Sequence, residues 1–223
     1  MLLIDDFLNE EDYKWVLDNK EELMAQTGGT YKWWDGWWKE PAKNIHHKFI
    51  EMIHTKYNPL GINYGWDLAA DKVDRKMYPN GIAGIEYWTN NDYRGGDWHV
   101  NCDEKVRHNE QKYVTPPWAI VYYINAPTEG GEIYISNRKA IDYPNPTPDP
   151  ANNDLEGYGR VPEDFIAIVK PAPNRITFID PSYWHRTMPF PQGQDRSTFI
   201  HDIWHTRIST AEAPAGQISR ADF

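Results

Sequence analysis

WAIVYYIN at residues 118–125 is an apolar run rich in β-branched and aromatic side chains, and it predicts a buried β-strand. Six further runs of this kind are separated by Gly, Pro and Asn, and they cover residues 82–88, 97–101, 131–136, 164–170, 175–180 and 197–204. Seven short strands at close intervals, preceded by helices, are typical of an antiparallel sandwich or barrel backed by helices. The sequence therefore predicts a mainly β protein.

The chain before residue 60 predicts a short apolar strand within residues 1–8 and two helices. Asn9 is suited to cap a helix over roughly 10–26, because three acidic residues follow it at the positive end of the helix. A second helix is expected over 41–57, with Pro41 at its first position. These helices are expected to support the β region.

The domain organisation follows from this division. We expect a single domain over 1–223, with helical support at about 9–57 and a β core at about 62–206. Residues 142–163 contain five prolines and little apolar material, and they predict a long surface loop. No internal repeat interrupts this plan.

Composition and charge exclude several classes of protein. The chain has 23 basic and 33 acidic residues and a net charge of −10, which argues against nucleic acid or an anionic membrane as the main partner. No stretch approaches the ~18 apolar residues that cross a bilayer. The first residues lack the basic segment of a signal peptide, and Cys102 has no second cysteine to pair with. A cytoplasmic location is therefore expected.

Three local patterns follow one another along the β region. The first is DWHVNCDE at residues 97–104, and the second is GGEIY at 130–134. The third is NRITF at 174–178, followed by His185-Arg186 and then by Arg196-Ser197-Thr198. Each pattern is weak alone, and their order and spacing carry the information.

In this order, the chain resembles the 2-oxoglutarate/Fe(II)-dependent dioxygenase superfamily, especially its prolyl-hydroxylase-like branch, over residues 82–204. The resemblance implies a double-stranded β-helix (jelly roll) with iron at its mouth. It implies His99 and His185 as iron ligands and Arg196 as the residue that binds the oxoacid. The cofactor would be Fe(II) and the cosubstrate 2-oxoglutarate. The implied reaction hydroxylates an unactivated C–H bond and releases succinate and CO2.

The chemistry of these residue types agrees with the resemblance. Two imidazoles and a carboxylate on one face of Fe(II) leave three positions, enough for a bidentate oxoacid and oxygen. Arg196 can grip a carboxylate with a fork of N–H donors. Thr198 lies two residues further along a strand, so it faces the same side and adds a hydroxyl. Tyr122 is a further candidate contact of the oxoacid, with Tyr123 and Tyr134 as alternatives.

Asn101 departs from the family pattern, which has Asp or Glu two residues after the first His. Asparagine coordinates through its carbonyl oxygen but carries no charge, so Asn101→Asp is expected to strengthen iron binding. Asp103 is the fallback ligand, although along a strand it would lie ~13 Å from His99. Halogenases of the superfamily carry Gly or Ala at this position to admit a halide, and Asn101 would fill that space. An inactive relative and an Asp-to-Asn variant are the other interpretations.

The alternative hypothesis is that the protein is a non-catalytic jelly roll, which binds a sugar or another ligand at an aromatic-lined site. The segment YKWWDGWW at residues 31–38 suggests such a site, although its aromatic side chains would also suit packing over the sheet. The substrate of the leading hypothesis is a small molecule, an amino acid or a peptide. The oligomeric state is open.

Several other histidines are interpreted as unrelated to the metal. His46, His47 and His54 are expected to be solvated residues of the second helix. His201 and His205 are expected to face the same side of the last strand as Phe199, opposite Arg196 and Thr198. In the strand at 82–88, alternation sends Glu86 and Trp88 to one face and Tyr87 to the other.

Overall fold

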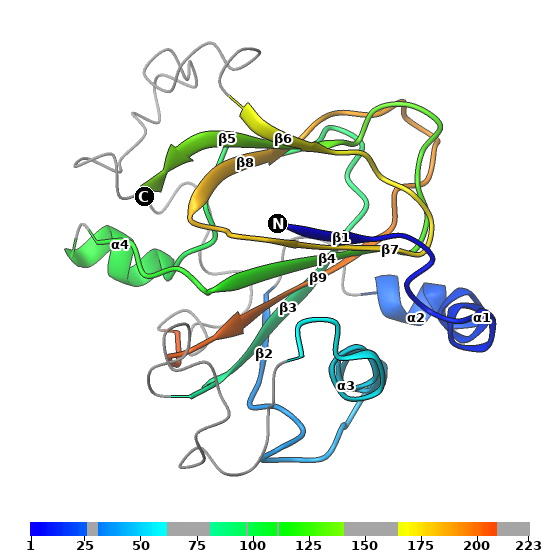
Figure 1. Cartoon of the computed structure of the whole chain (residues 1–223), viewed down its shortest axis with the longest axis horizontal. Helices are drawn as coiled ribbons and strands as arrows, with labels where there is room; N and C mark the ends of the chain where they lie inside the picture. Colours follow the sequence, from blue (N-terminus) through cyan, green and yellow to red (C-terminus); the bar gives the residue numbers. More distant parts are fainter. Residues whose placement is uncertain (26–30, 62–80, 97, 111, 141–164, 209–223) are drawn as a thin grey trace.

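A computed structural model describes residues 1–25, 31–61, 81–96, 98–110, 112–140 and 165–208 (Figure 1). These residues form two antiparallel sheets and a few short helices, so the predicted mainly β class is confirmed. The strands are β1 (Leu2–Ile4), β2 (Lys32–Trp34), β3 (Gly84–Asn90), β4 (Trp118–Tyr123), β5 (Ile133–Lys139), β6 (Phe165–Val169), β7 (Arg175–Ile179), β8 (Tyr183–Thr187) and β9 (Thr198–Trp204).

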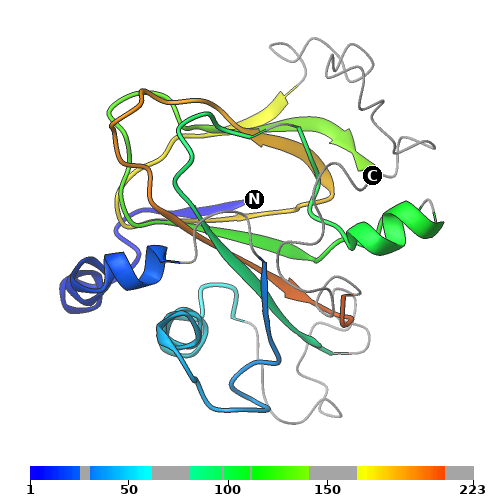
Figure 2. The same cartoon turned by 180° about the vertical axis from the view of Figure 1, so that it is seen from behind.

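The larger sheet has the strand order β1-β7-β4-β9-β3-β2, and the smaller sheet has the order β6-β5-β8. Figures 1 and 2 show that the two sheets lie one above the other. Strands that follow one another in the chain often lie in different sheets, as β4 and β5 do, and β7 and β8. The chain therefore crosses repeatedly between the two layers.

The helices are α1 (Glu10–Asp18), α2 (Lys20–Met24), α3 (Ile45–Glu51), which continues into the π-helix η1 (Met52–Tyr57), and α4 (Glu104–Glu110). Asn9 caps α1 as predicted, because its side chain accepts a hydrogen bond of 2.9 Å from the Asp12 N–H. The expected single helix over 10–26 is instead divided at Asn19, whose side chain donates to the Trp15 carbonyl. The second helix begins at Ile45, not at Pro41, because Asn44 caps it.

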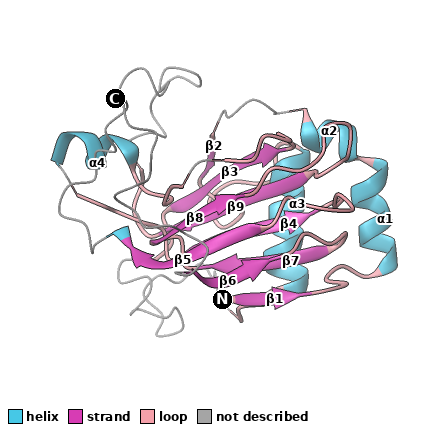
Figure 3. Ribbon diagram, turned by 90° about the horizontal axis from the view of Figure 1, so that it is seen from above, coloured by secondary structure: helices cyan, strands magenta, loops and turns pink. Residues whose placement is uncertain are grey.

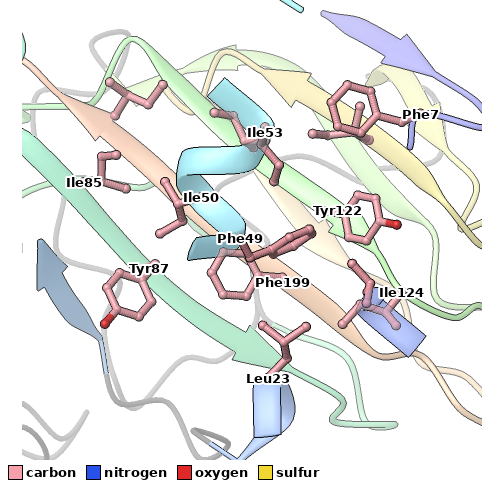
Figure 4. Close-up of a cluster of buried hydrophobic side chains, with 14 of the residues drawn as sticks. Phe7, Leu23, Phe49, Ile50, Ile53, Ile85, Tyr87, Tyr122, Ile124 and Phe199 are labelled. Atoms are coloured by element: carbon pink, nitrogen blue, oxygen red, sulfur yellow. The ribbon is translucent and has the colours of Figure 1, made fainter. Parts of the chain in front are cut away.

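Alternation along β4 defines the two faces of the larger sheet. Tyr122 packs with Phe49 of α3 and Phe199 of β9 in a core beneath the helices (Figure 4). The other even-numbered side chains of β4, Trp118 and Ile120, belong to the same cluster. The odd-numbered side chains pack with Ile133 and Ile135 of β5 in a second core between the sheets. Figure 3 shows the helices α1 and α3 lying against the strands of the larger sheet. The face between the sheets is the one that carries the candidate site.

Six of the seven predicted strands are confirmed, as β3, β4, β5, β6, β7 and β9. The expected strand at 97–101 is reduced to an isolated bridge at His99, and Asp97 lies outside the described residues. Strand β8 and helix α4 were not predicted. The expected long loop at 142–163 also lies outside the described residues, so it stays a prediction together with the single domain over 1–223. In the described part of the chain, no helix is long and apolar enough to cross a membrane.

The three histidines of the second helix are buried, so the expectation that they are solvated was wrong. His46 contacts the Leu23 carbonyl through Nε2 at 2.9 Å, and His47 contacts the Tyr87 hydroxyl at 3.1 Å. His54 meets His201 of β9, with 2.7 Å between the two Nε2 atoms. The physical reason is that the helix turns this side toward the sheet, where each imidazole finds a polar partner.

The Trp-rich segment supports this burial. Trp34 stacks on the His47 ring at 4.2 Å between centroids, and Trp37 stacks on the His54 ring at 5.8 Å. Trp34 and Trp38 are buried, and β2 within the segment pairs with β3. These tryptophans therefore pack over the sheet, on the face opposite to the space between the sheets.

The His54–His201 contact predicts a pH dependence of stability. One imidazole must donate and the other accept, and burial of both rings favours the neutral form of each in the folded protein. Burial lowers the pKa of His54 to about 3 and that of His201 well below 6.5. Because the unfolded chain binds more protons below pH 6.5, the free energy of unfolding contributed by this pair falls as the pH falls toward 3.

The variant His54→Gln removes one of these titrating groups. Between about pH 6 and 5, its free energy of unfolding is expected to fall by about 1 kcal/mol less than that of the wild type. Urea unfolding at the two pH values measures this difference. Identical pH slopes for the two proteins would contradict the neutral buried pair.

Candidate metal and anion site

Two histidines from distant parts of the chain lie side by side at the edge of the smaller sheet. The His99 N–H donates to the His185 carbonyl at 3.0 Å, and the His185 N–H donates to the His99 carbonyl at 2.9 Å. This isolated antiparallel bridge places the two imidazole centroids 4.4 Å apart. His99 is exposed and His185 is buried, so the pair lies at a boundary between solvent and interior. The two residues predicted as metal ligands are therefore brought together.

The orientation of the His185 ring suits a metal ligand. Its Nδ1 lies 2.8 Å from the Tyr183 carbonyl oxygen, which can only accept, so Nδ1 carries the proton. Nε2 consequently holds the lone pair that a metal would use. Burial lowers the pKa of His185 to about 3, which keeps the imidazole in the neutral form that metals bind.

Asn101 shares the side of the chain that carries His99. Trp98 and Val100, which alternate with these residues, pack instead in a cluster on the outer side of the smaller sheet. The Asn101 Nδ2 donates to both carboxylate oxygens of Asp202, at 2.9 and 3.2 Å. The residue predicted at the third-ligand position is therefore fixed against β9.

Asp103, the fallback ligand, has a different role in the structure. Its Oδ1 accepts a hydrogen bond of 3.1 Å from the Val106 N–H in the first turn of α4. The backbone N–H of Asp103 donates to the Val114 carbonyl. Asp103 thus caps a helix that begins directly after the histidine motif, and the structure does not favour it as a metal ligand.

Two buried acidic residues that were not among the predicted site residues lie beside Asn101. Asp202 on β9 and Glu86 on β3 occupy paired positions and face the same side of the larger sheet. Trp204 donates from Nε1 to Glu86 at 3.2 Å. Burial raises the pKa of Glu86 to about 8 and holds that of Asp202 well above its ordinary value. The sequence could have indicated Asp202, because every second side chain of a strand faces the same side. Residues 196, 198, 200 and 202 therefore share the face predicted to carry Arg196 and Thr198.

The side chains near His99 and His185 determine how a metal could be held. Among the described residues, no group of three His, Cys, Asp or Glu side chains is placed to hold a metal ion. Two imidazoles and the amide oxygen of Asn101 form a possible set, because His99 and Asn101 share one face and His185 lies across from His99. This set fits a divalent transition metal, with a neutral oxygen ligand in place of a carboxylate.

Arg196 is a buried cation near the start of β9. Its side chain is 1% exposed, and its Nε donates to the Gly131 carbonyl at 2.8 Å. The guanidinium carbon lies 5.3 Å from the centre of the Tyr123 ring. Within the described residues, no carboxylate forms an ion pair with Arg196, although the charge of Glu132 acts on it from further away. A buried cation without a counter-ion is costly, so this position suits an anion.

The structure corrects the choice of tyrosine. The Tyr122 hydroxyl donates to Asn174 at 3.0 Å, and its ring packs in the core beneath the helices (Figure 4). Tyr134 packs in the outer cluster of the smaller sheet. Tyr123 is the tyrosine that contacts Arg196, because it pairs with Thr198 across β4 and β9. The Thr198 hydroxyl donates to the Asn90 carbonyl at 2.8 Å.

Gly131 allows Arg196 to lie where it does. Its φ is +73°, and a Cβ atom at this position would lie 2.7 Å from the Arg196 Cδ. We expect Gly131→Ala to destabilise the protein by about 1–2 kcal/mol through the left-handed backbone alone, and also to displace Arg196. The matched control is Gly193→Ala, because Gly193 has a φ of +92° with open space around its Cβ position. Thermal unfolding should show a loss of stability in both variants, and titration with an anion should show weakened binding only in Gly131→Ala.

No family model matches the sequence, and no curated protein matches it. Among solved structures, the chain is similar to an oxidoreductase of the 2OG-Fe(II) oxygenase family from Burkholderia pseudomallei. The TM-score is 0.46 and the identity 9%, and the match covers 96% of this chain and 88% of that one.

Proposed function

We propose that the protein is an Fe(II)- and 2-oxoglutarate-dependent oxygenase that hydroxylates an unactivated C–H bond of a small molecule, an amino acid or a peptide. The observation that carries the proposal is Arg196, a buried cation without an ion-pair partner among the described residues, in a protein that also pairs His99 with His185. An acidic cosubstrate that chelates a metal would engage both features. The cytoplasmic location stays a prediction of the sequence.

The proposed architecture is a double-stranded β-helix. Its larger sheet would use β7, β4, β9 and β3, and its smaller sheet β6, β5 and β8. The segment around His99 would complete the smaller sheet, since it bridges to β8 at His185. The alternation of consecutive strands between the two layers supports this proposal.

The spacing between the paired histidines and Arg196 suits a dicarboxylate. His185 pairs with Ile135, and Gly131, which contacts Arg196, lies four residues earlier on the same segment. The two backbone positions are therefore at most about 13 Å apart, because four fully extended residues span that length. In the proposal, Arg196 holds the distal carboxylate with Tyr123 beside it. His99, His185 and Asn101 hold the metal.

When bound, Fe(II) and 2-oxoglutarate would supply the activation of O2 that hydroxylation requires, with release of succinate and CO2. The residues of the chain hold the metal, orient the oxoacid and exclude water from the buried end of the site. With Asn101 as a ligand, its side chain would fill the position that a halide needs at the metal, and its hydrogen bonds to Asp202 would hold it there, so a halogenase is not favoured.

The proposal is tested by succinate formation. The protein with Fe(II), 2-oxoglutarate and air is expected to form succinate slowly even without its substrate, and Arg196→Met is expected to form none. A protein that binds Fe(II) and the oxoacid but never forms succinate would instead support the non-catalytic jelly-roll function.

A further inference from the structure

We propose that Asp202 is a positioning residue that turns the amide oxygen of Asn101 toward the metal. This inference rests on the proposed function, because it concerns the same metal. It assigns a role to a side chain on β9, a strand that contributes neither of the two proposed histidine ligands, His99 and His185.

The first argument is the polarity of the hydrogen bond. An amide side chain has a donor end and an acceptor end, whereas a carboxylate only accepts. Both Asp202 oxygens lie within hydrogen-bond distance of the Asn101 Nδ2, at 2.9 and 3.2 Å. The donor end therefore faces Asp202, and Oδ1 is fixed on the other side of the planar amide. Without such a partner, the amide could equally present its NH2 group, which would repel a cation.

The second argument is the burial of Asp202. Its side chain is fully buried, and among the described residues it forms no ion pair with Lys, Arg or His. The neighbouring acid, Glu86, accepts a hydrogen bond from Trp204 and brings no positive charge to this region. Burial of a carboxylate with an amide as its hydrogen-bond partner is costly. A divalent cation at the other end of that amide would offset this cost.

The third argument is the rigidity of the position. Asp202 pairs with Glu86 of β3 on one side and with Ala119 of β4 on the other, in the middle of the larger sheet. The backbone therefore cannot withdraw the carboxylate from Asn101. Partners that orient metal ligands in this way typically change metal affinity 10- to 100-fold when they are replaced.

This contact changes the expectation for Asn101→Asp. A carboxyl group at 101 would lie against the Asp202 carboxyl group, and two acids at hydrogen-bond distance cannot both be ionised without strong repulsion. The gain from a charged ligand is therefore expected only when Asp202 is replaced as well. In Asn101→Asp/Asp202→Asn the two groups exchange places, and the amide at 202 donates to the carboxylate at 101.

The test is a charge-exchange cycle read out by metal affinity. Co(II), which serves as an air-stable probe, is titrated into the wild type, Asp202→Asn, Asn101→Asp and the double variant, with visible absorption as the signal. Asp202→Asn is expected to bind Co(II) at least about 10-fold more weakly, and the double variant is expected to regain wild-type affinity or exceed it. Asp195→Asn is the matched control, because Asp195 precedes β9 and contacts Ser197 and Lys20 instead.

Two results would overturn the inference: wild-type affinity in Asp202→Asn, or a double variant that binds no better than Asp202→Asn. The proposed function fails separately, if the wild type itself binds no Co(II). Should Asp202→Asn fail to fold, the Asn101 side-chain amide is observed by NMR in the metal-free wild type, with its signals assigned by their loss in Asn101→Asp. Slow hydrogen exchange is expected, and exchange at the rate of a solvent-exposed amide would overturn the inference.

Discussion

Replacing Arg196 by methionine is expected to abolish oxoacid binding while leaving the protein as stable as before, or more so. Loss of one partner of a buried charged pair costs about 2–5 kcal/mol of binding, which corresponds to a weakening of about 30-fold or more. The stability should not fall in parallel, because the Arg196 cation is buried without an ion pair among the described residues. Apolar replacements of poorly compensated buried charges are often neutral or stabilising.

Isothermal titration with 2-oxoglutarate and thermal unfolding without it measure the two quantities. Arg175→Met is the matched control, because Arg175 forms its ion pair with Asp5 and lies on β7. Arg196→Lys should bind the oxoacid with intermediate affinity, since it keeps the charge and loses the fork of donors. Unchanged oxoacid affinity in Arg196→Met would contradict the proposal that Arg196 binds the oxoacid.

Replacing His185 by alanine is expected to weaken metal binding at least about 100-fold, because the variant loses one of the three proposed ligands. The lone pair of His185 Nε2 is available because Nδ1 donates to the Tyr183 carbonyl. The variant should still fold, since β8 keeps its pairing with β5. Co(II) or Fe(II) titration measures the affinity.

His205→Ala is the control for this experiment, because His205 follows the end of β9 and contributes nothing to the proposed site. It should bind the metal as the wild type does. A His185→Ala protein with wild-type metal affinity would show that the two paired histidines do not form the metal site.

Strand periodicity predicted much of the site. Alternation along 197–204 placed Thr198 and His201 on opposite faces, and the structure confirms this arrangement. The same alternation separated Tyr87 from Glu86, which the structure also confirms. These predictions succeeded because a period of two is a local property of an extended chain.

The choice of tyrosine failed because it depends on the pairing between strands. Tyr122 and Tyr123 are equally plausible in the sequence, and only the pairing of Tyr123 with Thr198 decides which one faces Arg196. A shift of one residue in this register would exchange the two side chains. Register is set by contacts between distant segments, so it could not be obtained from one strand alone.

The histidines of α3 and η1 show a second limit. Their spacing predicted a solvated helix face, because nothing local indicates that Trp34 and Trp37 would fold over them. Helix α4 was also missed, and with it the role of Asp103 as its cap. The histidines were assigned without knowledge of their tertiary partners, whereas the role of Asp103 was missed although its partner, the Val106 N–H, is local.

The proposed function requires that one site of the protein holds both a metal and an oxoacid. Anaerobic addition of Fe(II) and 2-oxoglutarate to the wild type tests it most directly, because chelation of Fe(II) by the oxoacid produces a visible metal-to-ligand charge-transfer absorption. The account predicts that this absorption saturates at one Fe(II) and one oxoacid per chain, and that it is lost in both Arg196→Met and His185→Ala. No absorption in the wild type, or full absorption in either variant, would contradict it.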